Sequence, residues 1–305
     1  MLYYDDKKVR TRTLQGFLRA LAWDHQDRYL IVVGNRGRVL RIEEDRIVSL
    51  NSGTHNNLRA ISVNPLDGTA LIVGNTGTAL ILDEEERFTN LTAPSFENLR
   101  SVSWHQNGTV ALVAGNNGTL FKYSHQEFET VEAGRANLRG ISWRPNTNTA
   151  LISSNCFAEE FIPSPNLFNY DGETGIVKPV NEGRADLIGL DWKPTGESAL
   201  VVGYDVVWHN GLIGNFDGTK LSQIEFDNKH VYPVAAAWKL SASLAAIVTA
   251  TVEVGMARGT VILWDGNSLR PIYNDPNFFF SDAAWNWSGS TLAALASTGA
   301  RTFNS

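Results

Sequence analysis

Four arginines recur at nearly equal spacing through the first half of the chain, and an asparagine follows each of them after sixteen residues. The arginines are Arg19, Arg59, Arg100 and Arg139, and the asparagines are Asn35, Asn75, Asn116 and Asn155. Guanidinium groups bind carboxylates and phosphates through paired hydrogen bonds. They also donate to the side-chain oxygen of asparagine. The pattern therefore predicts a repeated structural clamp or an arc of cations that receives an anion, and the two can coexist.

These pairs belong to a repeat that a tryptophan marks. The marking residues, here called the tryptophan column, are Trp23, Val63, Trp104, Trp143, Trp192, Trp238 and Trp285. Their intervals are 40, 41, 39, 49, 46 and 47 residues. A period near forty residues is typical of repeat architectures, so the chain holds seven copies of one unit.

Each copy divides into four short strands. In the second copy the segments 58–63, 69–74, 78–82 and 87–91 are separated by Gly-, Asn- and Asp-rich turns, which predict hairpins. The second strand is apolar at nearly every position, as in ALIVG and ALVAG, which indicates burial on both faces. Four-stranded sheets with a neighbour on each side arrange radially, so the sequence predicts an all-β, seven-bladed β-propeller.

The two ends of the chain are expected to complete one blade together. The last copy supplies its first two strands, and LYYDDKKVRTRTL matches the third and fourth strands of other copies. We expect residues 1–305 to form one propeller domain, with the seventh blade shared between 1–15 and 280–305. RTFNS also falls in the third-strand register, so a two-plus-two closure and a three-plus-one closure both remain open.

Several third strands end in an aromatic–aspartate pair. The pairs are Tyr4-Asp5, Tyr170-Asp171, Phe216-Asp217 and Trp264-Asp265, the last within GTVILWDG. This pattern resembles the WD40-like and YVTN-like β-propeller superfamily over the whole chain. The Gly-His of true WD40 repeats is missing, so their histidine-linked network is not expected. GNTGTALILDEEERF and GNNGTLFKYSHQEF also resemble the Ycf48-like photosystem II assembly factor propellers, whose DGGxTW turn is absent. The resemblance implies a fold that serves scaffolds, enzymes and binding modules alike.

One rim of the ring differs between its two halves. The start of the first strand lies beside the end of the second, so the arginines and asparagines should share a rim around half of the channel mouth. The connections 155–166, 204–211 and 251–259 are longer than in other copies and project from the same rim. They carry Phe157, Phe161, Trp208, His209 and Arg258. We expect a binding surface of exposed aromatic residues there; the alternative is that these aromatics fold back onto the blades.

The opposite rim is expected to be plain. The turns Glu43–Asp45 and Asp83–Glu86 are predicted to be solvated acidic tips.

Other chemistry is mostly excluded by composition. A net charge of −6 argues against a DNA-binding surface and makes RNA binding unlikely. The six histidines lack metal-ligand spacing, and Cys156 stands alone, so we expect no metal, disulfide or cofactor. No apolar run approaches the length of a membrane span, and MLYYDDKKVRTRT lacks the apolar core of a signal peptide, so we expect a cytoplasmic protein.

The sequence therefore predicts a non-enzymatic scaffold, with no catalytic residues, that binds a protein or acidic peptide segment on the arginine side. Acidic groups of the partner would lie over the four arginines and apolar groups against the long connections. Two alternatives remain open. One is an enzyme or small-anion receptor that uses the channel mouth with His209, Glu159 or Glu160; the other is an RNA-binding module.

Overall fold

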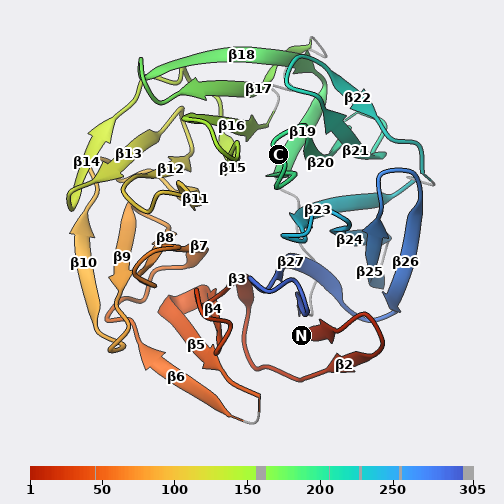
Figure 1. The fold of residues 1–305 in the computed structure, drawn as a ribbon, viewed down its shortest axis with the longest axis horizontal. Helices are drawn as coiled ribbons and strands as arrows, with labels where there is room; N and C mark the ends of the chain where they lie inside the picture. The colour runs from red at the N-terminus through yellow and green to blue at the C-terminus, as the bar shows by residue number, and fades with distance from the viewer. Residues whose placement is uncertain (45, 156–162, 206, 227–228, 254–255, 298–305) are drawn as a thin grey trace.

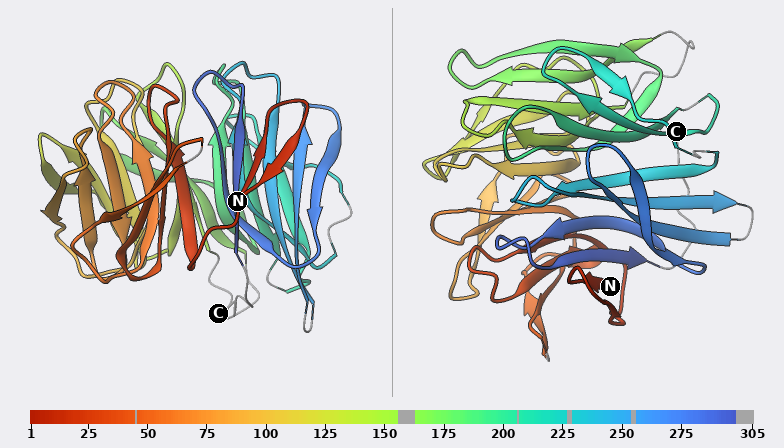
Figure 2. Two further views of the ribbon diagram at one scale, coloured as in Figure 1. Left: turned by 90° about the horizontal axis from the view of Figure 1, so that it is seen from below. Right: turned by 45° about the vertical axis from the view of Figure 1, so that its right-hand side comes forward.

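The computed structural model is a ring of seven four-stranded antiparallel sheets, so the predicted all-β, seven-bladed propeller is confirmed (Figure 1). It describes residues 1–44, 46–155, 163–205, 207–226, 229–253 and 256–297. Within these ranges the one helical element is a short 3-10 turn, Asn35–Gly37. Seen from the side, the sheets stand around the axis of a thick disc (Figure 2).

In each blade the strand nearest the axis comes first in the sequence and the outermost strand comes last, with blade 7 as the exception. Blade 1 holds β3 (Leu18–Trp23), β4 (Leu30–Gly34), β5 (Arg38–Ile42) and β6 (Ile47–Asn51). Blade 2 holds β7 (Leu58–Val63), β8 (Ala70–Gly74), β9 (Thr78–Leu82) and β10 (Phe88–Thr92). Blade 3 holds β11 (Leu99–Trp104), β12 (Ala111–Gly115), β13 (Leu120–Ser124) and β14 (Glu127–Thr130).

The next three blades follow the same order, and most of their strands are longer. Blade 4 holds β15 (Leu138–Trp143), β16 (Thr149–Ser154), β17 (Ser164–Asp171) and β18 (Ile176–Gly183). Blade 5 holds β19 (Ala185–Trp192), β20 (Ala199–Asp205), β21 (Gly211–Phe216) and β22 (Leu221–Gln223). Blade 6 holds β23 (Val231–Trp238), β24 (Ala245–Glu253), β25 (Met256–Trp264) and β26 (Leu269–Asp275).

Blade 7 joins the two ends of the chain. Its inner strands are β27 (Phe279–Trp285) and β28 (Leu292–Ser297), and its outer strands are β1 (Leu2–Tyr4) and β2 (Val9–Thr11). β1 pairs with β28 in antiparallel register, for example Tyr3 opposite Ala293. The described strands therefore close the ring two plus two.

The core lies between the blades. The buried apolar side chains of the described residues form seven clusters, one at each interface between neighbouring blades. The second strand of a blade contributes to the clusters on both of its sides, and every residue of β4, β8 and β12 is buried. Each fully buried Leu, Ile or Val contributes roughly 1.5–3 kcal/mol to stability. The last cluster joins blade 7 to blade 1 through Leu295, Met1 and Leu18, so the hydrophobic contact is continuous around the ring.

One predicted connection is wrong. The segment 251–259 was expected to be a loop, but β24 and β25 continue through most of it, with Thr251 paired to Arg258. Thr249, Thr251 and Val252 are β-branched and favour extended backbone, which explains why the hairpin lengthens here.

Three glycine turns tie neighbouring blades together. Gly37, Gly77 and Gly118 have φ of 69°, 66° and 67°, a region that side chains disfavour. Their N–H groups donate to carbonyl oxygens of Asn56, Glu97 and Ala136, in the segments that lead into the next blade, at 2.7, 2.9 and 2.7 Å. A Cβ atom at Gly37 would lie 1.8 Å from the Thr54 carbonyl oxygen, so only glycine fits the approach.

Replacing Gly37 by alanine should destabilise the ring far more than the same change at Gly53. Both glycines have positive φ, of 69° and 73°, but a Cβ at Gly53 meets nothing within 4 Å. Gly53→Ala should cost about 1 kcal/mol for the backbone conformation. Gly37→Ala should cost about 3 kcal/mol or more, because a steric clash is added. Urea denaturation midpoints measure the difference, and equal midpoints would contradict the close approach.

Candidate functional site

Each innermost strand carries a β-bulge four residues before the tryptophan column. The register shifts there in all seven blades. A bulge leaves one residue out of the ladder and redirects its side chain. The bulge residues are Arg19, Arg59, Arg100, Arg139, Ile188, Val234 and Ser281. The backbone forms the same bulge at all seven positions, so the fold does not require arginine at the four positions that carry it.

Each of these arginines is bound to the asparagine of its own blade. The Nε atom of Arg19 donates to Asn35 Oδ1 at 2.5 Å, and Arg100 donates to Asn116 at 3.0 Å. Arg59 and Asn75 form the same bond, as do Arg139 and Asn155 at 2.5 Å. This bond fixes the plane of each guanidinium group within its blade.

A second set of asparagines, which the sequence reasoning missed, links one blade to the next. Asn57, Asn98 and Asn137 stand two residues before an arginine. Their Oδ1 atoms accept from the backbone N–H groups of Arg36, Thr76 and Asn117 in the preceding blade at 3.0, 3.2 and 3.1 Å. The repeated triplet Asn-Leu-Arg was the available signal. At this rim the second set of asparagines links neighbouring blades, whereas each arginine–asparagine bond lies within one blade.

The arginines gather around one mouth of the ring, here called the arginine rim, and are partly buried there. Burial lowers the pKa of Arg19 and Arg139. It lowers the pKa of Arg100 to about 10, and the like charges of Arg139 and Arg19 act in the same direction. Asp186 opposes this effect at Arg139. Among the described residues, no carboxylate is found to offset the charge of Arg19 or Arg100.

Blade 5 ends the arc with a different pair. Asp186 takes the place of the linking asparagine, and Tyr204 takes the place of the arginine-bound asparagine. The Tyr204 hydroxyl donates to Asp186 Oδ2 at 3.1 Å, and its ring packs edge-on against Tyr232 with centroids 5.2 Å apart. Asp186 is nearly fully buried, and its carboxylate acts on the charge of Arg139. The sequence reasoning did not select Asp186.

Aromatic side chains are exposed on the same rim. Trp208 is 69% exposed, so it does not fold back onto the blade, and the adjacent His209 is also exposed. Phe17, Phe96 and Phe278, which the sequence reasoning missed, are 59%, 89% and 36% exposed. They lie in the segments that enter β3, β11 and β27, on the side where the arginines begin.

The other predicted residues of the long connections divide into two groups. Arg258 is exposed on β25 instead of lying in a loop. Phe157 and Phe161, with Cys156, Glu159 and Glu160, lie outside the described residues.

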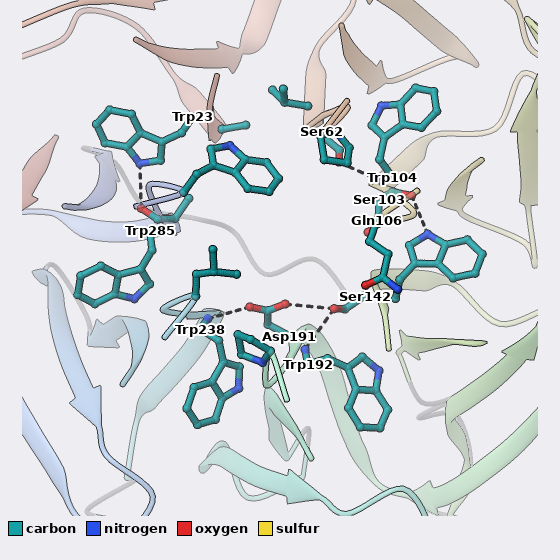
Figure 3. A pocket seen from close by; sticks show the side chains of 18 of the residues that line it. Trp23, Ser62, Ser103, Trp104, Gln106, Ser142, Asp191, Trp192, Trp238 and Trp285 are labelled. Atoms are coloured by element: carbon teal, nitrogen blue, oxygen red, sulfur yellow. Dashed lines mark hydrogen bonds between the residues drawn. The ribbon is translucent and has the colours of Figure 1, made fainter. Parts of the chain in front are cut away.

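The opposite rim is not plain, and that prediction is wrong. A cavity of about 600 Å³ opens there, where the innermost strands end (Figure 3). The six tryptophans of the column stand around it. The acidic turns of this side are partly or fully solvent-exposed, as predicted, and form surface ion pairs: Glu43 and Glu86 both pair with Arg41, and Asp83 pairs with Arg87 at 2.8 Å. Asp45 lies outside the described residues. Below, this opening is called the tryptophan mouth.

The tryptophans hold the blades together. Trp23 Nε1 donates to the Ala284 carbonyl at 3.2 Å, and Trp143 Nε1 donates to Ser103 at 3.0 Å, each across a blade boundary. In blades 4, 5 and 6 the residue after the column position is a cation that covers the indole of the next blade. Arg144 lies 4.9 Å over Trp192, Lys193 lies 5.9 Å over Trp238 and Lys239 lies 5.1 Å over Trp285. Such cation–π contacts contribute roughly 0.5–1 kcal/mol each at partly exposed sites.

Two carboxyl groups cap backbone N–H groups that the innermost strands leave unpaired toward the axis. Asp191 Oδ2 accepts from Trp238 N at 2.8 Å, and Asp282 Oδ2 accepts from Leu21 N at 2.9 Å. Burial raises the pKa of Asp191 to about 6 and that of Asp282 to about 7, against the effect of these hydrogen bonds. The ring is therefore lined by acidic groups that the fold keeps poorly hydrated.

Two features are absent from the described ranges, a metal-ligand cluster and a membrane-spanning helix. No cluster of three or more His, Cys, Asp or Glu side chains there could hold a metal ion. No helix in those ranges has the length and apolar character to cross a membrane.

The comparisons with known proteins show a similarity of fold and no similarity of sequence family. No protein-family model matches the sequence, and no curated protein matches it. A chain of Kuenenia stuttgartiensis hydrazine synthase superposes with a TM-score of 0.74 at 11% identity, over 96% of this chain and 99% of that chain. U3-55K superposes with a TM-score of 0.70 at 11% identity, over 93% and 89%. These likenesses support the propeller fold, while membership of the WD40-like or YVTN-like superfamily stays a prediction.

Replacing Asp282 by asparagine should change the pH dependence of stability. The carboxyl has a pKa of about 7 in the folded chain and about 3.9 when unfolded, so the folded state binds more protons between these values. Stability must therefore fall as pH rises through this range, and Asp282→Asn removes that loss.

The asparagine variant should gain about 1–2 kcal/mol over the wild type between pH 4.5 and 8, less than the full shift implies because Asp282 keeps some solvent contact. Urea unfolding across this pH series measures the gain. A difference between the two proteins that stays constant with pH would contradict the raised pKa.

Proposed function

We propose that this protein is a non-enzymatic interaction platform whose arginine rim receives an acidic segment of a partner protein. The observation that carries the proposal is the state of Arg19 and Arg100. Both are partly buried, both have a lowered pKa, and no carboxylate of the described residues is found to offset them. Like charges gathered in a poorly hydrated mouth cost stability, and a bound anion removes that cost.

The hydrogen-bond geometry suits such a ligand. A guanidinium group has five N–H donors, and the bond to asparagine uses the one on Nε. The bond holds the group in a fixed plane, so less side-chain entropy is lost when its Nη atoms bind a carboxylate. Clamp and ligand site are thus compatible functions of one side chain.

The exposed aromatics give the same rim apolar contacts. Arginine, tryptophan and other aromatic residues dominate the energetically important positions of protein interfaces. Trp208, Phe96 and Phe17 are each more than half exposed on this side of the ring. A partner segment that combines acidic and apolar side chains would use both features, while a free small anion would use only the first.

The alternative of an enzyme or a small-anion receptor has less support. It needs a pocket that joins His209 to the arginines, and the cavity described above lies at the tryptophan mouth instead. The likeness to a hydrazine synthase chain is a likeness of fold at 11% identity and brings no activity to this chain.

Neutralising two arginines should weaken recognition of acidic peptides. Peptides selected from a random display library on the wild-type protein should be acidic and carry apolar residues. Arg19→Gln combined with Arg100→Gln should weaken their binding at least tenfold, since two charge-assisted contacts are lost. Fluorescence anisotropy with labelled peptides measures this, and raised salt should weaken wild-type binding as well.

Two controls separate charge from folding. Arg87→Gln removes one positive charge from a turn on the opposite side, where its side chain is 71% exposed, and should leave peptide affinity unchanged. Arg19→Lys with Arg100→Lys keeps the charge but loses the planar donor set, so it should retain part of the affinity. Selected peptides without net negative charge, or equal affinity for the glutamine variant with its fold intact, would reject the proposal.

A further inference from the structure

The repeat offers an internal comparison at the tryptophan mouth. The residue before each column position is Ala22, Ser62, Ser103, Ser142, Asp191, Ala237 or Ala284. Two of the serines cap the next blade: Ser62 Oγ accepts from Trp104 N at 3.1 Å, and Ser142 Oγ accepts from Trp192 N at 3.2 Å. Asp191 performs the same task for Trp238 N at 2.8 Å. A neutral hydroxyl is therefore sufficient for this structural duty, and the fold does not require a carboxylate.

The charge of Asp191 is costly where it lies. Burial raises its pKa to about 6, and the groups that counteract this are the hydrogen bonds from Trp238 N, Ser142 Oγ and Trp192 N. No lysine or arginine of the described residues is found to counteract it. The cations of this rim, Arg144, Lys193 and Lys239, lie over indole rings, and the two lysines pair with Glu197 and Asp6. The carboxylate is thus mostly ionised near neutral pH and has no ionic partner within the described chain.

The surroundings of Asp191 form a cavity of ligand size. The volume of about 600 Å³ falls within the range of small-molecule sites. Asp191 is the one ionisable side chain among the residues that line it. Figure 3 shows its carboxylate between Ser142 and Trp238, on the inner side of the ring of indoles. Ser62, Ser103 and Gln106 supply further oxygen atoms to the lining.

The entrance to the cavity is apolar. Two residues after the column, the lining consists of Pro65, Gln106, Pro145, Pro194, Leu240 and Trp287. Leu240 is 58% exposed and Trp287 is 39% exposed, so both offer surface to a ligand. One partly buried negative charge, a few neutral oxygen acceptors and a mostly apolar entrance together match a ligand with a cationic head and an apolar body.

We propose that the tryptophan mouth binds an organic primary ammonium group, which pairs with the Asp191 carboxylate while the apolar body of the ligand packs against Leu240 and Trp287. An ammonium group has three donors and no acceptor, so a carboxylate with neighbouring hydroxyl and amide oxygens satisfies it. Each Asp191 oxygen already accepts one hydrogen bond and has capacity for another. The site is independent of the arginine rim.

Three probes that share a phenylethyl body test the head group. 2-Phenylethylamine carries the ammonium group, 2-phenylethanol is its neutral counterpart, and 3-phenylpropanoate is anionic. Titration calorimetry and the indole N–H signals in nitrogen-15 NMR spectra should show binding of the amine. The alcohol and the carboxylate should bind at least tenfold more weakly. Equal affinity for the amine and the alcohol would overturn the proposal.

The variants use the repeat as their control. Asp191→Asn and Asp191→Ser should weaken amine binding at least tenfold and keep the fold, since serine performs the same capping in blades 2 and 4. Asp282→Asn neutralises another buried, backbone-capping carboxyl that does not line the cavity, and it should bind the amine unchanged. Arg19→Gln with Arg100→Gln should bind it unchanged as well. Retained affinity in Asp191→Asn, or equal loss in Asp282→Asn, would overturn the proposal.

A peptide arm distinguishes the source of the ammonium group. N-acetylated, C-amidated Lys-Phe carries the group on a protein side chain and should compete with the amine if the natural ligand is a lysine of a partner. Amine binding without peptide binding assigns the site to a free amine. Binding of neither molecule to the wild type overturns the proposal.

Discussion

The structure depends on one constraint: the second strand of every blade is apolar on both faces, so each sheet must be covered on both sides. A flat stack of sheets would leave two uncovered ends, and a ring leaves none. The clusters between neighbouring blades show the result, including the one that joins Leu295 to Leu18 across the chain ends. The column tryptophans serve the same purpose, because indole rings packed between blades bring large apolar area to each boundary. Closure, register and the position of both mouths follow from this need for cover.

Closing the ring creates a second requirement. Each innermost strand turns one edge toward the axis, where its N–H groups have no sheet partner. Serine and aspartate side chains from the preceding blade cap some of them, as Ser142 does for Trp192 and Asp282 does for Leu21. The strands around the axis therefore need polar capping groups, but these groups need not be charged. Both serine and aspartate accept these hydrogen bonds, but only for aspartate does burial raise a pKa.

The sequence was sufficient for the fold because the signals of the fold are repeated. Six tryptophan-column intervals, apolar second strands and a half-blade at each end leave one architecture. The arginine–asparagine pairs could be placed on one rim by antiparallel geometry alone. Asp191 and Asp186 could not be found in this way, since each occurs once and its importance lies in neighbours from another blade.

The cavity could not be predicted for a similar reason. The tryptophans are recognisable as repeat markers, but their meeting around one opening is a property of the closed ring. The length of the segment 251–259 suggests a loop, whereas its β-branched residues favour the longer hairpin that the structure has.

A symmetric ring also provides a criterion for separating function from structure. Equivalent positions carry equivalent structural duties, so a change that alters charge without altering the duty needs another explanation. Isoleucine, valine and serine occupy the same bulge as the arginines, and serine performs the same capping as Asp191. The arginines lie at one mouth and Asp191 lies at the other. Arg100 and Asp191 are both partly desolvated, and among the described residues no opposite charge is found to offset either of them. Since the fold accepts neutral residues at both places, the arginines and Asp191 are the residues for which we propose two different ligands.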